Sequence, residues 1–400
     1  MAEFEIRGAH RGLIALAAGG TGGHLFPAQA LAEELVRRGY ITILLSDARA
    51  KSYGGDFPAI DIAEIPSSTL SIRKPWKLPF QAFRLWRGMK KSRILLGRNR
   101  PKAIIGFGGY PSFPPLLTAV KLGIPSAIHE QNAVMGRANR AMAKKVDVIA
   151  SSFPEIAHLP EKLKDKIVFT GNPVRAAVIE AAKTPYAPPD GKGTFELLIF
   201  GGSQGAHYFA ELAPKMLAEM PEAVRKRLHV TQQARPEDID ALRHDFNRLG
   251  IDATVESFFD DMPKRMAKAH LVMARSGASS VAELAVIGRP AILVPLPHAL
   301  DNDQLMNARA FARAGAGWVY KQDMIQPEQM AAFITRLRYA PDDLMAAHKA
   351  ARAFARPDAA ARLADVVEKL AGADEEPAGA ASGAATPEAA SGGTNSGETS

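Results

Sequence analysis

Two glycine-rich turns are the residues of this chain best suited to chemistry on a phosphate. The first reads GGTGGH over residues 19–24, and the second reads GGSQGA over residues 201–206. Each follows a short apolar run, residues 13–18 and 195–200, and precedes a helical pattern. Glycines let a backbone approach a ligand closely, and the N–H groups at a helix N-terminus attract phosphate. The repeated unit predicts two nucleotide-fold domains that face each other across a cleft.

His24 closes the first turn and is the candidate general base. An imidazole accepts a proton near neutral pH, although a helix N-terminus lowers its pKa. The turn departs from the dinucleotide fingerprint because Leu25 occupies the third glycine position, but Asp47, after the second strand, keeps a dehydrogenase open as an alternative. A purely structural turn is the other alternative. Ligands of open α/β sheets bind at the carboxyl ends of strands, which favours a functional site.

Two segments of the second half fit a nucleotide. The turn at 201–206 lacks the Lys-Ser/Thr ending of a P-loop, so it predicts diphosphate binding by backbone N–H groups and Ser203 without ATP hydrolysis. In residues 275–283 small residues lead into a helix, and Glu283 lies one turn inside it, where a carboxylate can accept hydrogen bonds from two sugar hydroxyls. An ordinary capped helix is the alternative, and the pairing with 201–206 favours a nucleotide.

The elements that must position these residues alternate between strand and helix patterns. We expect buried strands near 41–45, 103–105, 126–128 and 146–150, and again near 228–232, 253–256, 270–274, 290–294 and 317–320. A helical pattern fills residues 326–370. The alternation predicts an α/β fold in which helices cover parallel sheets.

Composition and patterning also suggest where the domains begin and end. The segment before residue 195 is rich in Pro and Gly, and the last thirty residues have no periodicity. We expect an N-terminal extension (1–11), a first domain (12–175), a linker (176–194), a second domain (195–350), a helix packing back on the first domain (351–370) and a disordered tail (371–400).

The amino-acid composition indicates the cellular compartment. The 400 residues include no cysteine, which excludes disulfides and thiolate metal sites and fits a reducing cytoplasm. The first residues are acidic where a signal peptide needs positive charge, and no apolar run reaches the roughly 18 residues of a membrane span. We therefore expect a soluble or peripheral protein.

Positive charge is concentrated in the first half. Residues 1–175 hold 26 Lys and Arg against 13 Asp and Glu, and residues 65–129 contain no acidic residue at all. Inside that stretch an expected helix carries aromatic residues every third position, with basic residues beside them. Aromatic and basic side chains together suit an anionic bilayer, whereas a core helix with a solvated basic face is the alternative. No nucleic-acid motif occurs, so nucleic acid is not an expected partner. The predicted membrane-binding residues are Phe80, Phe83, Trp86, Arg84, Arg87 and Lys90.

Read in order, several runs of the chain resemble the MurG family of bacterial N-acetylglucosaminyltransferases, which convert lipid I to lipid II in peptidoglycan synthesis. The runs are 20–27 (GTGGHLFP), 129–132 (HEQN), 171–175 (GNPVR), 201–205 (GGSQG) and 275–278 (RSGA), together with 295–307. The resemblance covers about residues 12 to 370. It implies a GT-B fold: α/β, with two Rossmann-like domains whose parallel sheets face each other across a cleft. The C-terminal domain would hold most of the sugar nucleotide, and the N-terminal domain the acceptor.

The resemblance assigns UDP-N-acetylglucosamine to residues of both halves. Asn132 would lie close to the transferred sugar, and Gln304 would bind its hydroxyls. Arg175 and Ser203 would approach the phosphates and the nucleoside, and Glu283 the ribose. Phe259 stands where the family has an aliphatic residue whose backbone holds the uracil. The remaining donor residues are Thr21, Gly22 and Gly23 in the cleft, and Ala278, Ser279, Ser280, Val281 and Ala282 over the diphosphate and ribose.

The acceptor side has its own glycine turn. Residues 106–114 follow an expected strand, and their glycines suit a pyrophosphate. A simple turn before a helix is the alternative, but the family has a similar loop there. The resemblance therefore implies that Gly108, Gly109 and Tyr110 bind the acceptor's pyrophosphate. Asp303 occupies a position where the family often has His or Gln, and it receives no role.

The implied reaction is an inverting displacement at the anomeric carbon by the 4-hydroxyl of N-acetylmuramic acid, with UDP leaving. His24 is the candidate base and Glu130 the weaker one. No cofactor is expected, and no metal, because the chain has no spaced Asp-x-Asp pair at an expected strand end. The partners would be the donor, undecaprenyl-linked lipid I, the anionic cytoplasmic face of the bacterial inner membrane and cell-wall synthesis proteins. Cell-wall biogenesis, cell shape and division would depend on this reaction.

Three alternatives remain at this stage. One is a related UDP-sugar glycolipid transferase that uses diacylglycerol, and a second is a UDP-sugar epimerase of the same fold. An epimerase has no use for a basic aromatic helix. The third is a nucleotide-binding membrane adaptor without catalysis. Acceptor-dependent release of UDP separates all of these.

Overall fold

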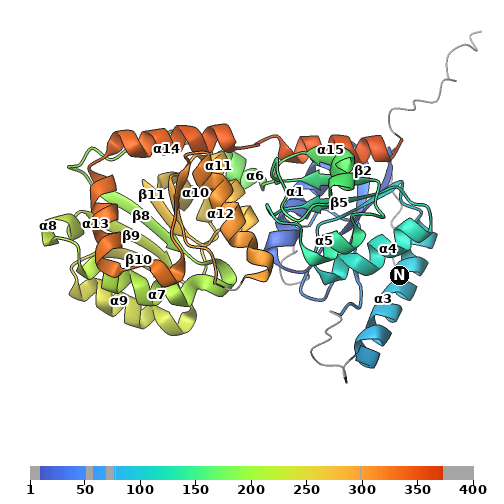
Figure 1. The fold of residues 1–400 in the computed structure, drawn as a ribbon, viewed down its shortest axis with the longest axis horizontal. Helices are drawn as coiled ribbons and strands as arrows, with labels where there is room; N and C mark the ends of the chain where they lie inside the picture. Colours follow the sequence, from blue (N-terminus) through green and yellow to red (C-terminus); the bar gives the residue numbers. More distant parts are fainter. Residues whose placement is uncertain (1–9, 51–56, 69–75, 77, 298, 373–400) are drawn as a thin grey trace, which may run out of the picture.

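The computed structural model describes residues 10–50, 57–68, 76, 78–297 and 299–372, without the side chains of residues 202–206 and 300. Most of the expected extension (1–11) and tail (371–400) lies outside the described residues. Two parallel sheets, each covered by helices, follow one another along the long axis of the molecule (Figure 1). The expected α/β fold with two Rossmann-like domains is confirmed.

The first sheet has seven parallel strands in the order β3-β2-β1-β4-β5-β6-β7. Its central strands are short and largely buried, as parallel strands between helices require, and β1 and β4 are apolar runs. The strands are β1 (Gly12–Ala17), β2 (Tyr40–Ser46), β3 (Asp61–Glu64), β4 (Ala103–Gly106), β5 (Ser126–Glu130), β6 (Val148–Ser151) and β7 (Ile167–Phe169). The helices are α1 (Gly22–Arg37), α3 (Leu78–Asn99), α4 (Phe113–Lys121) and α5 (Arg137–Met142), with 3₁₀ turns η2 (Tyr110–Ser112) and η3 (Glu161–Lys166).

The second sheet has six parallel strands in the order β10-β9-β8-β11-β12-β13. They are β8 (Phe195–Phe200), β9 (Leu228–Gln233), β10 (Asp252–Glu256), β11 (Leu271–Ala274), β12 (Ala291–Leu293) and β13 (Gly317–Val319). The helices between them are α7 (Gly202–Ala218), α8 (Glu222–Arg225), α9 (Ile239–Arg248), α10 (Met262–Lys268), α11 (Ala278–Ile287) and α12 (Asp303–Arg313). Three 3₁₀ turns complete the domain: η4 (Pro236–Asp238), η5 (Leu300–Asn302) and η6 (Gln322–Met324).

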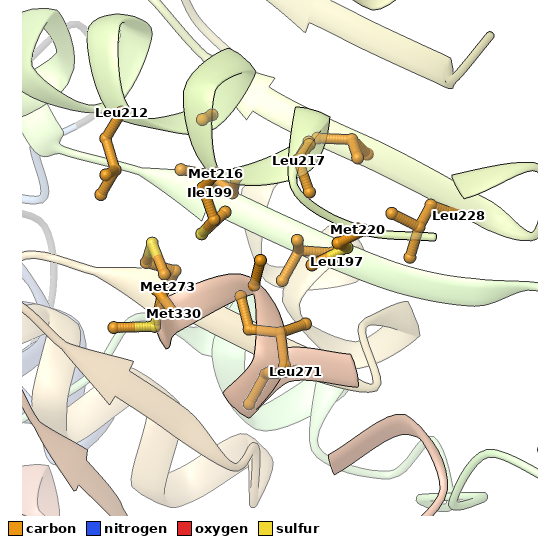
Figure 2. Packing of buried hydrophobic residues seen from close by; sticks show 14 of the residues in the cluster. Leu197, Ile199, Leu212, Met216, Leu217, Met220, Leu228, Leu271, Met273 and Met330 are labelled. Atoms are coloured by element: carbon orange, nitrogen blue, oxygen red, sulfur yellow. The ribbon is translucent and has the colours of Figure 1, made fainter. Parts of the chain in front are cut away.

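Alternation along β8 shows how the second domain builds its core. Leu197 and Ile199 face a cluster that includes Met216 of α7 and Met273 of β11, which Figure 2 shows from close by. Leu198, one residue on, belongs to a separate cluster on the other side of the sheet. Both faces of the strand are therefore buried, and β8 is fixed as a central strand.

The segment predicted as a linker, 176–194, begins with helix α6 (Ala176–Ala181). Val178 and Ala181 are buried in the same cluster as Leu198 and Val272 of the second sheet, and α6 lies against α10 and α11. This helix therefore packs with the second domain, and the extended connection follows it.

Three helices end the described chain: α13 (Pro327–Arg338), α14 (Pro341–Phe354) and α15 (Ala359–Leu370). α14 runs along the second domain against α11, and α15 crosses to the first domain and lies against α1 (Figure 1). Leu363 and Val367 of α15 are buried in the core of the first domain. Arg38, which follows α1, contacts Asp365 at 2.6 Å and Glu368 at 2.5 Å, so the last helix is held by apolar packing and by charge.

Candidate active site

A large pocket opens at the carboxyl ends of the first sheet. Its volume is about 670 Å³, and most of its wall comes from loops that follow β1, β2, β4 and β5. Asp301 and Asp303 of the second domain complete it, so both domains contribute. The predicted site residues on its wall are Thr21, His24, Arg84, Gly108, Gly109, Tyr110, Glu130 and Asn132.

The imidazole of His24 lies between two glycine turns. A Cβ at Gly19 would stand 3.0 Å from its Cδ2 atom, and one at Gly109 would stand 3.3 Å from it, so neither position has room for a larger residue without movement. Gly109 also has φ of 75°, which L side chains rarely adopt. The glycines around this pocket therefore serve the placement of His24 as well as any phosphate.

The surroundings of His24 favour the neutral form of its imidazole. Its Nδ1 atom is buried and has no hydrogen-bond partner. Burial lowers the pKa of His24 below 6.5, and the Phe107 carbonyl and the Gln131 side chain oppose that shift. A neutral imidazole on the pocket wall has a lone pair that can accept a proton, so His24 stays the predicted base.

The carboxylate of Glu130 accepts hydrogen bonds from the segment that follows it. One carboxylate oxygen accepts the backbone N–H of Asn132 at 3.0 Å, and the other accepts the Gly136 N–H and the Asn139 Nδ2, each at 2.9 Å. Burial raises the pKa of Glu130, and these donors oppose the increase. The carboxylate therefore organises residues 131–139, and its geometry fits that role better than proton transfer from a substrate.

The first turn presents its backbone to open space. A Cβ at Gly23 would meet no atom within 4 Å, whereas one at Gly22 would stand 3.0 Å from the ring of Phe26. Thr21 is exposed on the pocket wall. Gly20 is different, because a Cβ there would stand 2.1 Å from Oδ1 of Asp47. This turn is therefore closed on the side of Asp47 and open at Gly23.

Two predicted donor residues meet at the seam between the domains. Arg175 Nη2 donates to Glu283 Oε1 at 3.3 Å, and the same guanidinium lies over the ring of Phe26 at 4.3 Å from its centroid. Glu283 is buried, which raises its pKa, and Arg175 works in the opposite direction. Neither residue lines the large pocket. These two donor residues therefore lie outside the pocket, whereas the predicted donor residues Thr21 and Asn132 line it.

Only some residues of the first turn of α11 are exposed to a ligand at this seam. Ser279 has a buried hydroxyl without a partner, and a Cβ at Gly277 would meet no atom within 4 Å. Val281 is instead buried in the core of the second domain, so it can offer only its backbone to a ligand. Ala278, Ser280 and Ala282 are partly exposed.

The remaining donor residues are spread over the second domain. Phe259 is buried under the guanidinium of Arg265, 4.2 Å from the ring centroid. Gln304 is held by its neighbours: its Oε1 accepts the Leu296 N–H at 3.0 Å, and its carbonyl accepts the Ser276 hydroxyl. The side chain of Ser203 lies outside the described residues.

Several residues that received no predicted role lie where the two domains meet. Asn307 of α12 donates from Nδ2 to Asn132 Oδ1 at 2.9 Å, and its Oδ1 accepts the Ala133 N–H at 2.8 Å. Asp301 lies 3.4 Å from Arg137 Nε and 3.6 Å from Arg140 Nη2. Asp303 faces the pocket, and burial raises its pKa. For Asn307 the available sequence signals were a polar residue inside an amphipathic helix and its place in the run 295–307.

Helix α3 exposes its aromatic residues. The exposed fractions are 64% for Phe80, 52% for Phe83 and 55% for Trp86. Each ring has a cation four residues later within about 6 Å of its centroid: Arg84 over Phe80, Arg87 over Phe83 and Lys90 over Trp86. These side chains are therefore not part of a core. Among the described helices, none combines the length and apolar character that crossing a bilayer requires.

Within the described residues, no group of three or more His, Asp or Glu side chains has the arrangement of a metal site. Two Rossmann-like domains share a pocket at the carboxyl ends of the first sheet, with the His24 imidazole on its wall. The buried Glu283 and the half-buried Arg175 form an ion pair outside that pocket. This is the architecture of the GT-B fold, which glycosyltransferases share with UDP-sugar epimerases.

Comparison with known proteins gives the family. The model for the glycosyltransferase family 28 N-terminal domain matches residues 14–151, and that for the family 28 C-terminal domain matches residues 196–363. The chain belongs to glycosyltransferase family 28.

Individual relatives agree with this membership. The UDP-N-acetylglucosamine–N-acetylmuramyl-(pentapeptide) pyrophosphoryl-undecaprenol N-acetylglucosamine transferase of Mesorhizobium japonicum is 50% identical over 90% of this chain and 96% of its own length. The crystal structure of Acinetobacter baumannii MurG is 28% identical, with a TM-score of 0.71 over 89% of this chain and 99% of its own. A UDP-N-acetylglucosamine 2-epimerase, 15% identical with a TM-score of 0.61 over 91% of this chain and 98% of its own, shares the fold alone.

Proposed function

We propose that this glycosyltransferase moves N-acetylglucosamine from UDP-N-acetylglucosamine to the 4-hydroxyl of N-acetylmuramic acid in lipid I, forming lipid II. The observation that carries the proposal is the 50% identity, over nearly the whole of both chains, to a transferase with this substrate pair in its name. The first-domain pocket with His24 on its wall supports it, because an acceptor needs a base beside its hydroxyl.

The chemistry divides between the two domains. The neutral His24 accepts the proton of the attacking hydroxyl, which forms a bond to the anomeric carbon as the bond to the UDP oxygen breaks. Negative charge then develops on the leaving diphosphate. In this proposal, Arg175 and the N–H groups at the starts of α7 and α11 stabilise that charge. Glu283, buried beside Arg175, accepts hydrogen bonds from the ribose hydroxyls.

The location follows from the acceptor. A polyprenyl-linked substrate stays in the bilayer, and the exposed aromatic and basic face of α3 suits an anionic membrane surface. We therefore place the enzyme peripherally on the cytoplasmic face of the bacterial inner membrane, where cell-wall synthesis proteins are its natural neighbours.

Release of UDP tests the proposal. The purified chain is incubated with UDP-N-acetylglucosamine alone, with lipid I added, and with diacylglycerol added. We expect UDP to appear only with lipid I. Release without acceptor would indicate hydrolysis of the donor, and release with diacylglycerol a different glycolipid transferase. No release would indicate an adaptor or an epimerase, which keeps UDP on the sugar. Any of these three results would refute the proposed reaction.

A further inference from the structure

Arg84 belongs both to the membrane-facing helix and to the pocket. It lies on α3 between the exposed rings of Phe80 and Trp86, yet its side chain forms part of the pocket wall together with His24 and the 108–109 turn. The sequence grouped it with Arg87 and Lys90 as a membrane residue. Among the α3 residues that the structure describes, only Arg84 lines the pocket.

The packing of α3 explains this position. A Cβ at Gly88 would stand 2.1 Å from the carbonyl oxygen of Pro66, so the helix lies directly against the segment at 65–68. That segment is itself pocket wall. Arg84 precedes Gly88 by four residues and therefore shares its face of the helix. The close contact at Gly88 brings Arg84 to the edge of the pocket.

Arg84 differs from the other two arginines of the pocket wall in its charge partners. Arg49 contacts Asp47 at 2.6 Å and Arg137 contacts Asp301 at 3.4 Å, so two of the three guanidinium groups on the wall have acidic partners. Among the described residues, Arg84 has no ion pair, although Glu64 lies on the same wall. Its guanidinium carbon lies 5.9 Å from the centroid of the Phe80 ring. This cation is available to an anionic ligand.

We propose that Arg84 binds the diphosphate of the lipid-linked acceptor where the lipid leaves the bilayer and enters the pocket. The inference rests on the proposed function. A lipid whose chain lies in the membrane beside Phe80, Phe83 and Trp86 has its diphosphate at the level of the pocket edge, and its sugar then extends toward His24. Guanidinium and diphosphate form charge-assisted, bidentate hydrogen bonds. The glycine turn at 108–109 lies on the same wall.

Kinetics with a short-chain, water-soluble lipid I analogue, in the absence of vesicles, test this role apart from membrane binding. Arg84→Gln removes the charge, Arg84→Lys keeps it, and Arg98→Gln removes an exposed charge from the last turn of the same helix. We expect Arg84→Gln to raise the acceptor KM about 10- to 100-fold, the usual effect of losing one charged hydrogen-bonding group. Arg84→Lys should restore part of the loss. The donor KM of Arg84→Gln should stay within twofold of the wild-type value. The donor and acceptor KM values of Arg98→Gln should do the same.

An equal effect of Arg84→Gln and Arg98→Gln on the acceptor KM would overturn the proposal, as would an unchanged acceptor KM in Arg84→Gln.

Direct binding keeps the proposal testable even if no sugar transfer occurs. Calorimetry with farnesyl diphosphate, farnesyl monophosphate and inorganic pyrophosphate should show that farnesyl diphosphate binds most tightly and loses about tenfold or more in Arg84→Gln. If farnesyl diphosphate binds as expected but no sugar is transferred, the proposed function is refuted, while Arg84 remains a diphosphate-binding residue. Equal binding of inorganic pyrophosphate would overturn the assignment to a lipid.

Discussion

Asn307 of the second domain and Asn132 of the first are joined side chain to side chain, with Nδ2 of Asn307 donating to Oδ1 of Asn132 at 2.9 Å. The same Nδ2 donates to the carbonyl of Ser276 at 3.1 Å, and Oδ1 accepts the Ala133 N–H. Asn307 is fully buried. One amide therefore ties the loop after β5 to the loop that precedes α11, at the junction of the acceptor pocket and the donor-binding half.

Replacing Asn307 by Ala should weaken this junction. The change leaves the Ala133 N–H and the Ser276 carbonyl without their partner, which costs about 1 to 3 kcal/mol for a buried group. We expect a lower free energy of unfolding and a lower transfer rate, measured by denaturant unfolding and by acceptor-dependent UDP release. Asn247→Ala, on an exposed face of α9, is the control and should change stability by less than about 0.5 kcal/mol. Equal stability of the two variants would contradict the role of Asn307.

Substitution of His24 by Ala should lower kcat about 10²- to 10⁴-fold, because loss of a general base removes the proton acceptor. The wild-type rate should also fall on the acid side with a pKa below 6.5, since burial lowers the pKa of His24 and only the neutral ring accepts a proton. The exposed His244→Ala variant is the control. A His24→Ala enzyme within a few-fold of wild type would show that His24 is not the base.

Glu130→Gln separates an organising role from catalysis. The amide nitrogen would face N–H donors where an oxygen now accepts them, so residues 131–139 should lose their arrangement at a cost of about 1 to 3 kcal/mol. Activity should decrease while the acid limb of the pH–rate profile stays in place. If that limb disappeared and stability were unchanged, Glu130 and not the imidazole would be the base. The exposed Glu155→Gln variant serves as the matched control.

His129 should make stability depend on pH. Its Nε2 lies 3.0 Å from the Gly171 carbonyl, and burial lowers its pKa to about 4 from an ordinary value of 6.5. Between these values the unfolded chain binds a proton that the folded chain does not, so stability falls as pH decreases from about 6.5 to about 4. The expected loss is about 3 kcal/mol for this group. Unfolding free energies of wild type and His129→Gln at pH 7 and pH 5 should converge at the lower pH. Parallel curves would contradict the assignment.

Sequence patterns predicted the elements that carry strong local signals. Strands such as β8 are continuous apolar runs, and the glycine turns after β1 and β8 are unmistakable. Strands β3 and β7 were missed because they are short, partly exposed edge strands without such runs. Helical periodicity identified the aromatic stripe of α3, whose exposure the structure now shows.

Contacts between segments far apart in the sequence could not be predicted from local sequence patterns. Arg84 lies on the pocket wall because Pro66 packs against Gly88, and no local spacing encodes that approach. Likewise, the donors to Glu130 come from Gly136 and from Asn139 of α5, whose placement depends on the whole domain. The pairing of Asn132 with Asn307 requires both domains to be in place.

The structure of the transferred product tests the central claim most directly. Lipid I is incubated with the purified enzyme and UDP-N-acetylglucosamine labelled with ¹³C in the sugar, and the lipid product is examined by NMR and mass spectrometry. The account predicts one N-acetylglucosamine per lipid, joined in β configuration to O4 of N-acetylmuramic acid, with one UDP released. An α linkage, attachment at another hydroxyl, or a lipid that carries no label would contradict it.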